Sequence, residues 1–146
     1  MRKEQLLNLL GPDARRAFDN ARRLARAKGG VLSPLHLLVA LIEDFSPASS
    51  DKDGERAELL AMVSEALSDR YSEAADSITV SKETQTMLAE AGRIALSEGS
   101  ETVLPIHLLR AALATATASE AIRDGEEFGR RAGRLLAAGI RAASGP

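Results

Sequence analysis

The eight residues "VLSPLHLL" at 31–38 return, with few changes, as "TVLPIHLL" at 102–109. The apolar positions before each segment return as well, because those of 14–25 reappear at 84–95 with a constant shift of seventy residues. A repeat with so long a period that occurs only twice differs from the common solenoid repeats. Since matched apolar positions require the same buried face, the chain is predicted to fold as two similar helical units.

The first unit reads as a series of helices separated by polar or glycine-rich turns. Residues 12–28 predict an amphipathic helix with a proline near its start and Gly29-Gly30 at its end. Ser33 and Pro34 predict the N-cap and first turn of a short buried helix that extends to residue 42. A polar loop at 45–53 and a helix at 54–69 are expected next. The inward residues expected of that helix are Ala57, Leu60, Val63, Ala66 and Leu67.

The second unit repeats this order after a connection over residues 70–80. Ser81 is predicted to cap its first helix, and "DGE" at 124–126 repeats "DGE" at 53–55 at the head of its last helix. "SITV" at 77–80 is too short a strand pattern to change the class. The predicted fold is therefore all-α, a single domain over 1–146. Its two pseudo-twofold repeats, of about four helices each, cover about 11–70 and 81–143.

Composition excludes several classes of function. The absence of cysteine rules out disulfides, thiol catalysis and cysteine-bound zinc, and it favours a cytoplasmic location. No apolar run approaches the ~20 residues of a membrane span, and the N-terminus lacks the features of a signal peptide. A formal net charge of −2 argues against a nucleic-acid partner. The few aromatic residues argue against a stacked cofactor, and no cofactor is expected; they are Phe18, Phe45, Tyr71 and Phe128.

The two histidines, His36 and His107, are the residues that most suggest chemistry. A metal site needs three or four ligands, and no motif of a Ser-His-Asp enzyme is present. Each histidine falls in the first turn of a predicted helix, so we interpret both as structural groups that cap backbone or pack under the preceding loop. The arginines of 15–26 could form a phosphate-binding stripe, but the charged outer face of an amphipathic helix explains them more simply.

The repeated unit, a long amphipathic helix, a glycine loop and then Pro-x-His-Leu-Leu, resembles the duplicated N-terminal domain of the Clp/Hsp100 unfoldases. The segments that carry the resemblance are "SPLHLL" at 33–38 and "LPIHLL" at 104–109, and it covers about 11–143. The resemblance implies a non-enzymatic, monomeric module that captures unfolded or tagged protein segments and adaptor proteins for an AAA+ hexamer, in cis or in trans. No G-x-x-x-x-G-K-[ST] motif occurs in the sequence, so no P-loop is expected here.

One branch of this family has an acidic residue before the histidine, and those carboxylates help to bind phosphorylated arginine. Leu35 and Ile106 occupy these positions here, and an aliphatic group cannot pair with a guanidinium, so that activity is not carried over. The two residues are either core or part of an apolar groove. If they are exposed, the peptide-binding residues would be Leu32, Leu35, Glu101, Val103 and Ile106.

The alternative to a recruiting domain is a free-standing regulatory or adaptor protein that competes for the partners of such an unfoldase. The ending "RAASGP" at 141–146 resembles the start of a linker, which favours a domain of a longer protein.

Overall fold

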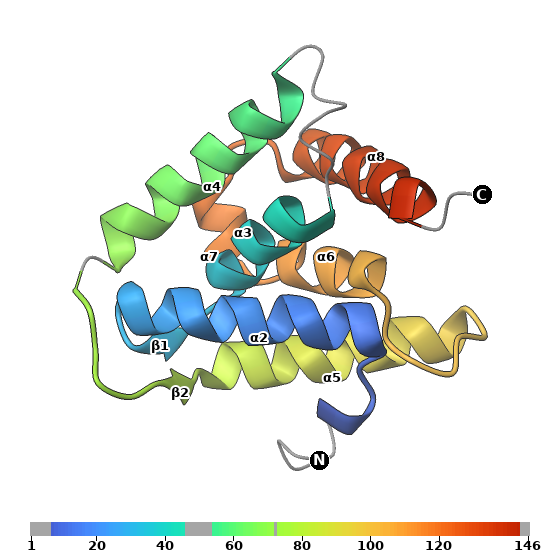
Figure 1. Ribbon diagram of the computed structural model, residues 1–146, viewed down its shortest axis with the longest axis horizontal. Helices are drawn as coiled ribbons and strands as arrows, with labels where there is room; N and C mark the ends of the chain where they lie inside the picture. Colours follow the sequence, from blue (N-terminus) through green and yellow to red (C-terminus); the bar gives the residue numbers. More distant parts are fainter. Residues whose placement is uncertain (1–6, 46–53, 72, 144–146) are drawn as a thin grey trace.

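The computed structural model describes residues 7–45, 54–71 and 73–143, and its fold is all-α, as predicted (Figure 1). The helices are α2 (Pro12–Ala27), α3 (Pro34–Phe45), α4 (Glu55–Arg70), α5 (Lys82–Ser97), α6 (Pro105–Leu113), α7 (Ala116–Ala121) and α8 (Gly125–Ala143). Two short strands, β1 (Val31–Leu32) and β2 (Thr79–Val80), join the two units. The sequence did not predict α7, and the positions equivalent to it in the first unit lie outside the described residues.

Helices α2 and α5 bury the same face, as the shared register predicts. The buried residues of α2 are Ala14, Ala17, Phe18, Ala21 and Ala25, and those of α5 are Thr84, Met87, Leu88, Ala91 and Ala95. Pro12 opens α2 at a position where a proline loses no helical hydrogen bond. Ser81 caps α5, because its Oγ accepts a hydrogen bond of 3.0 Å from the amide of Thr84.

The centre of the core is formed by α3 and α6, the helices that begin with the repeated motif (Figure 1). Helix α3 contacts α2, α4, α6 and α8, and residues 32–42 are all buried. Helix α6 contacts α3, α5 and α8. In Figure 1, α2 and α5 lie along one side of this central pair, and α4 and α8 lie along the other. The residues of α3 are apolar around most of the helix because other helices pack against it on several sides.

The structure corrects the prediction for one inward residue of α4 and the prediction for the end of α8. Ala57 is exposed, and α4 buries Leu59, Val63 and Leu67 against α3, a narrow stripe with a spacing of four residues. Residues 141–143, expected to begin a linker, are instead the last turn of α8. The polar loop expected at 45–53 lies outside the described residues after residue 45.

In each unit, the extended loop before the central helix forms backbone hydrogen bonds with a short extended segment that leads into the other unit's first helix. Strand β1 of the first unit pairs in parallel with β2, the segment that leads into α5. In the same way, Leu10 before α2 forms a parallel bridge with Val103 before α6. The hydrogen bonds match as well: the amide of Ser81 donates to Leu32 O, and the amide of Gly11 donates to Val103 O. These paired contacts follow the repeat shift, so they support the predicted pseudo-twofold arrangement.

Candidate functional site

The buried His36 connects the start of α3 to the end of α2. Its Nδ1 accepts a hydrogen bond of 3.1 Å from the amide of Ser33, so its proton is on Nε2, which donates to Lys28 O at 2.9 Å. Burial lowers the pKa of His36, and the hydrogen bond to the Lys28 carbonyl offsets part of that effect. The imidazole is therefore neutral near pH 7, and both of its nitrogens are used to hold the fold.

The buried His107 connects the start of α6 to the end of α5, and its second partner is a side chain instead of a backbone carbonyl. Its Nδ1 accepts from the amide of Leu104 at 2.9 Å, and its Nε2 lies 3.2 Å from a carboxylate oxygen of Glu98. The hydrogen bond from Arg110 to Glu98 is the main cause that lowers the pKa of this carboxylate. The structural interpretation of both histidines agrees with this geometry. In the described ranges, no group of three or more His, Asp or Glu residues could hold a metal ion.

The structure separates the five residues predicted to bind a peptide. Leu32 and Leu35 have no exposed surface, so the prediction that they contact a peptide is wrong. The physical reason is that the start of α3 is covered by its neighbouring helices. Ile106 is half-buried and faces α8, where its Cδ1 lies 3.7 Å from the position of a Cβ on Gly133. Only Glu101 and Val103 lie together on a hollowed part of the surface, between α5 and the segment before α2.

This hollow, which we call the apolar groove, has a volume of about 380 Å³. Its walls are the second half of α5, the loop before α6 and the extended segment before α2. The residues that define it are Leu9, Ala89, Gly92, Leu96, Glu101 and Val103. A cleft of this size with a mainly apolar lining is typical of ligand-binding sites.

Glycine and leucine residues give the groove its shape. A Cβ on Gly92 would lie 3.3 Å from Leu9 Cδ1, so the missing side chain leaves room for Leu9 to lie against α5. Leu96 is 77% exposed and Leu9 is 36% exposed, although large apolar residues are usually covered in a folded domain. Val103 forms the buried floor and is fixed by its bridge to Leu10. The groove therefore presents apolar surface that no other part of the described residues covers.

Charged residues stand only at the edge of the groove. Arg93 is held by Glu90, one turn earlier on α5, and their hydrogen bond is the main cause that lowers the pKa of Glu90. Glu101 is exposed, and Ser100 Oγ turns back to donate to Thr102 O at 2.6 Å. Because these polar groups are exposed or paired with each other, the groove offers burial of apolar surface as its main source of binding energy.

Known structures share this architecture. A chain solved in preliminary structural investigations of a malarial protein secretion system is 21% identical, with a TM-score of 0.71 over 91% of this chain and 95% of that one. The Hsp104 N-terminal domain from Candida albicans is 23% identical, with a TM-score of 0.63 over 84% and 88%. The N-domain of ClpV in complex with a VipB peptide is 16% identical, with a TM-score of 0.65 over 94% and 92%.

The chain has a Clp N-domain-like fold. The sequence matches no protein-family model and no curated protein. The resemblance read from the duplicated Pro-x-His-Leu-Leu motif and the resemblance in three dimensions therefore agree on the same kind of domain. None of the helices in the described residues is long and apolar enough to cross a membrane.

Four of the six residues that define the groove were not predicted from the sequence of this Clp N-like domain, namely Leu9, Ala89, Gly92 and Leu96. A signal for Leu96 was present, because it falls outside the buried register of α5 and matches Arg26 of α2 at the repeat shift. A large apolar residue at a position where the other repeat has an arginine indicates exposed apolar surface. Leu9 carries no such signal, since its place beside α5 depends on the bridge between Leu10 and Val103.

Proposed function

We propose that this Clp N-like domain recruits protein partners for a Clp-type AAA+ unfoldase by binding a peptide segment in the apolar groove. Leu96 carries the proposal, because it is 77% exposed at the rim of a hollow whose other walls include Leu9 and Val103. Two structural neighbours support a peptide as the occupant: the ClpV N-domain solved with a VipB peptide, and a solved structure of the same fold described as a peptide from the EAEC T6SS Sci1 SciI protein.

The occupant proposed is a segment that presents two or three aliphatic side chains, from an unfolded protein or an adaptor. Burying one such side chain contributes about 1.5–3 kcal/mol, and association costs several kcal/mol, so one domain should bind with micromolar affinity or weaker. A hexameric AAA+ partner, in cis or in trans, would compensate by presenting six copies at high local concentration. The proposed role is non-catalytic, and a cytoplasmic location remains a prediction from the sequence.

The experiment is a titration of fluorescein-labelled β-casein, an unfolded probe, with the purified domain. Leu96→Glu should weaken binding about tenfold, because it places a carboxylate at the rim of the groove and removes an apolar contact. The matched control is Leu104→Glu, since Leu104 is 43% exposed and lies outside the groove. That variant should bind like the parent.

Binding through the groove should also persist between 50 and 300 mM salt, because screening weakens exposed charge pairs and not apolar burial. Equal affinity of the Leu96→Glu variant and the parent would remove the groove from the proposal. An equal loss in the Leu104→Glu variant would mean that the titration reports nonspecific adsorption.

A further inference from the structure

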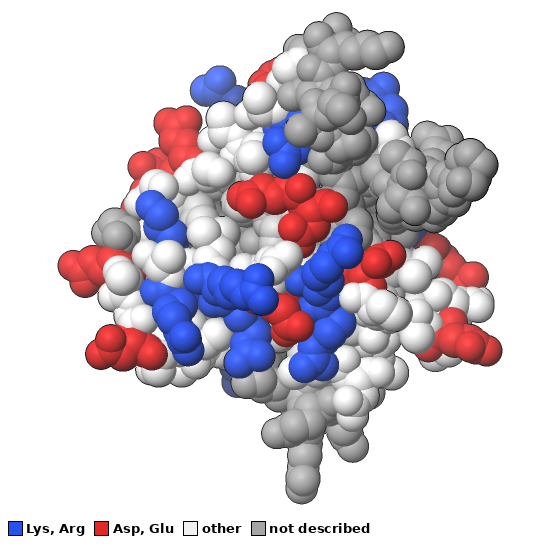
Figure 2. Space-filling model, viewed as in Figure 1, with Lys and Arg blue, Asp and Glu red and all other residues white. Residues whose placement is uncertain are grey.

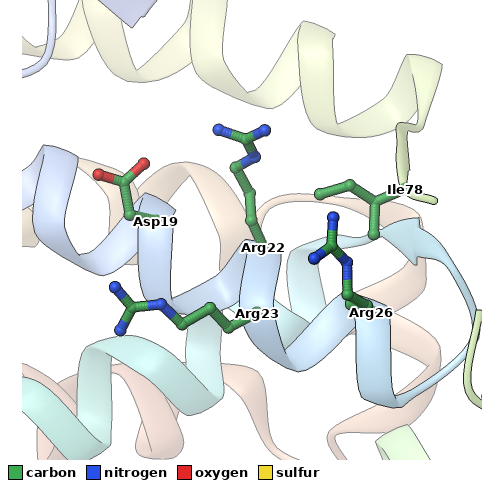
Figure 3. Close-up of a pocket in the computed structure, with 5 residues that line it drawn as sticks. All are labelled: Asp19, Arg22, Arg23, Arg26 and Ile78. Carbon is green, nitrogen blue, oxygen red and sulfur yellow. The ribbon is translucent and has the colours of Figure 1, made fainter. Parts of the chain in front are cut away.

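A second hollow occupies the equivalent place in the first unit (Figure 3). It has a volume of about 330 Å³ and is lined by Asp19, Arg22, Arg23, Arg26 and Ile78, which we call the arginine hollow. At the repeat shift, the four α2 residues of this set match Ala89, Gly92, Arg93 and Leu96, all of which line the apolar groove. The same place in the fold is thus apolar in one unit and basic in the other.

Among the residues that the structure describes, two guanidinium groups of this hollow have no hydrogen-bond or ion-pair partner. Figure 3 shows Arg22 and Arg26 extending to the side of α2 that faces Ile78, whereas Arg23 points the other way. Arg23 donates to Asn20 Oδ1 at 2.9 Å. Across the described residues, the guanidinium groups of Arg22 and Arg26 make no hydrogen bond and no ion pair, and both residues are exposed. They are therefore free to bind an anion.

The arginine hollow lies within a basic stripe on α2 (Figure 2). The helix contains five arginines in its sixteen residues, namely Arg15, Arg16, Arg22, Arg23 and Arg26. Asp19 partly neutralises the stripe, but it lies 3.5 Å from Arg15 and is engaged there. In a chain of formal net charge −2, this local excess of positive charge creates a surface that attracts acidic groups.

We propose that the arginine hollow binds an acidic segment of a partner protein through two carboxylates, one on Arg22 and one on Arg26. The two arginines are four residues apart on α2, so their α-carbons lie about 6 Å apart along the helix. Side chains two residues apart on an extended peptide lie about 7 Å apart, which fits this spacing. A guanidinium binds a carboxylate with two parallel hydrogen bonds, and the half-buried Ile78 offers apolar surface to the residue between them.

The chemistry of the hollow favours a protein partner over a nucleic acid. Its lining residues include no aromatic side chain on which a base could stack. Acidic side chains border the basic stripe in Figure 2, and they would repel a long polyanion more than a short acidic segment. This surface is separate from the apolar groove, so the domain would hold two chemically different segments at equivalent places.

The test uses a fluorescein-labelled twelve-residue peptide with a central Glu-Leu-Glu flanked by glycine and serine, and a matched peptide with Gln-Leu-Gln. The purified domain should bind the acidic peptide more tightly, and the double variant R22Q/R26Q should lose about tenfold in affinity. Asp19→Asn should strengthen binding about twofold, because it removes a competing negative charge. Raising the salt from 50 to 300 mM should weaken all of this binding.

The matched control is R123Q/R130Q, which removes the same charge from exposed arginines near and within α8. It should bind like the parent, and so should Leu96→Glu, which keeps this proposal separate from the one on the apolar groove. Equal binding of the two peptides, or an equal loss in the control, would overturn the proposal. Tighter binding of a single-stranded oligonucleotide or a phosphoserine peptide, lost in R22Q/R26Q, would assign the hollow to that partner instead.

Discussion

The loop after α2 is covered by other parts of the chain, whereas the equivalent loop after α5 is open. The amide of Gly29 donates to Glu73 O, and a Cβ on Gly29 would lie 2.7 Å from Tyr71. The ring of Tyr71 also lies 5.1 Å from that of His36. Around Gly99, the equivalent glycine, a Cβ would meet no atom of the described part of the chain within 4 Å. One copy of the motif has thus become an enclosed part of the framework, and the other leaves its surface available beside the apolar groove.

Where the motif is buried in both units, matching substitutions should lower the unfolding free energy by similar amounts. This is the largest effect that we expect. Leu38 and Leu109 are both buried at matching positions of α3 and α6. Truncating either to alanine leaves a cavity and should cost about 2–5 kcal/mol of unfolding free energy. Chemical denaturation of the two variants measures this. Parent-like stability of both would show that the matched register does not form the core.

Alanine should cost more stability at Gly29 than at Gly99, because only the loop of Gly29 is covered by other residues. Both have a positive φ, +103° at Gly29 and +75° at Gly99, so alanine is strained at either position. Gly99→Ala should cost about 1–2 kcal/mol, the usual penalty for a left-handed residue with a Cβ. Gly29→Ala should cost about 1–3 kcal/mol more, since its Cβ overlaps Tyr71. Thermal melting of the pair measures the difference, and equal losses would contradict the covered loop.

In the first unit, the buried His36 should make the stability of the domain depend on pH. Burial lowers the pKa of His36 from 6.5, so the folded state resists a proton that the unfolded state accepts. Stability is therefore complete above about pH 6.5 and falls as the pH drops below it, by at most about 1.4 kcal/mol per pH unit.

The measurement is the melting temperature of the parent and of His36→Gln at pH 7.5 and 5.5. His36→Gln should lose less stability between these values than the parent. A parent-like decrease in the His36→Gln variant would show that another group controls this range.

The smallest change in melting temperature is expected on removal of the ion pairs between α4 and α8, the last helices of the two units. Arg131 of α8 donates to Glu55 at 3.2 Å and to Glu58 at 2.9 Å, and its hydrogen bond is the main cause that lowers the pKa of Glu58. Arg131→Gln should lower the melting temperature slightly at low salt, because exposed ion pairs contribute little. The difference should vanish at 0.5 M salt, and a loss that persists there would indicate lost packing instead.

The sequence was sufficient for the parts of the structure that repeat. The shared register of 14–25 and 84–95 predicted the buried faces of α2 and α5, because helical periodicity alone decides which side is apolar. It placed α4 within a residue at each end and predicted its buried Val63 and Leu67, but it chose Ala57 as an inward residue where the structure buries Leu59 against α3.

The candidate site was less predictable, since it depends on contacts between distant parts of the chain. Leu35 and Ile106 match in sequence, but Leu35 is fully buried whereas Ile106 is half-buried beside α8. Leu9 joins the apolar groove only because a parallel bridge positions the segment before α2 against the loop before α6. No local pattern contains that information.

The parallel bridges at β1 and at Val103 make the two halves depend on each other for completion. In each half, the loop before the central helix has backbone groups whose partners belong to the other half, on the opposite side of the repeat. A fragment with one repeat would leave those groups to water and expose the apolar sides of α3 or α6. Contacts so distant in sequence slow folding, because loop-closure entropy is lost before they form. The two halves should therefore unfold together, so that a destabilising substitution in either half lowers the stability of the whole domain.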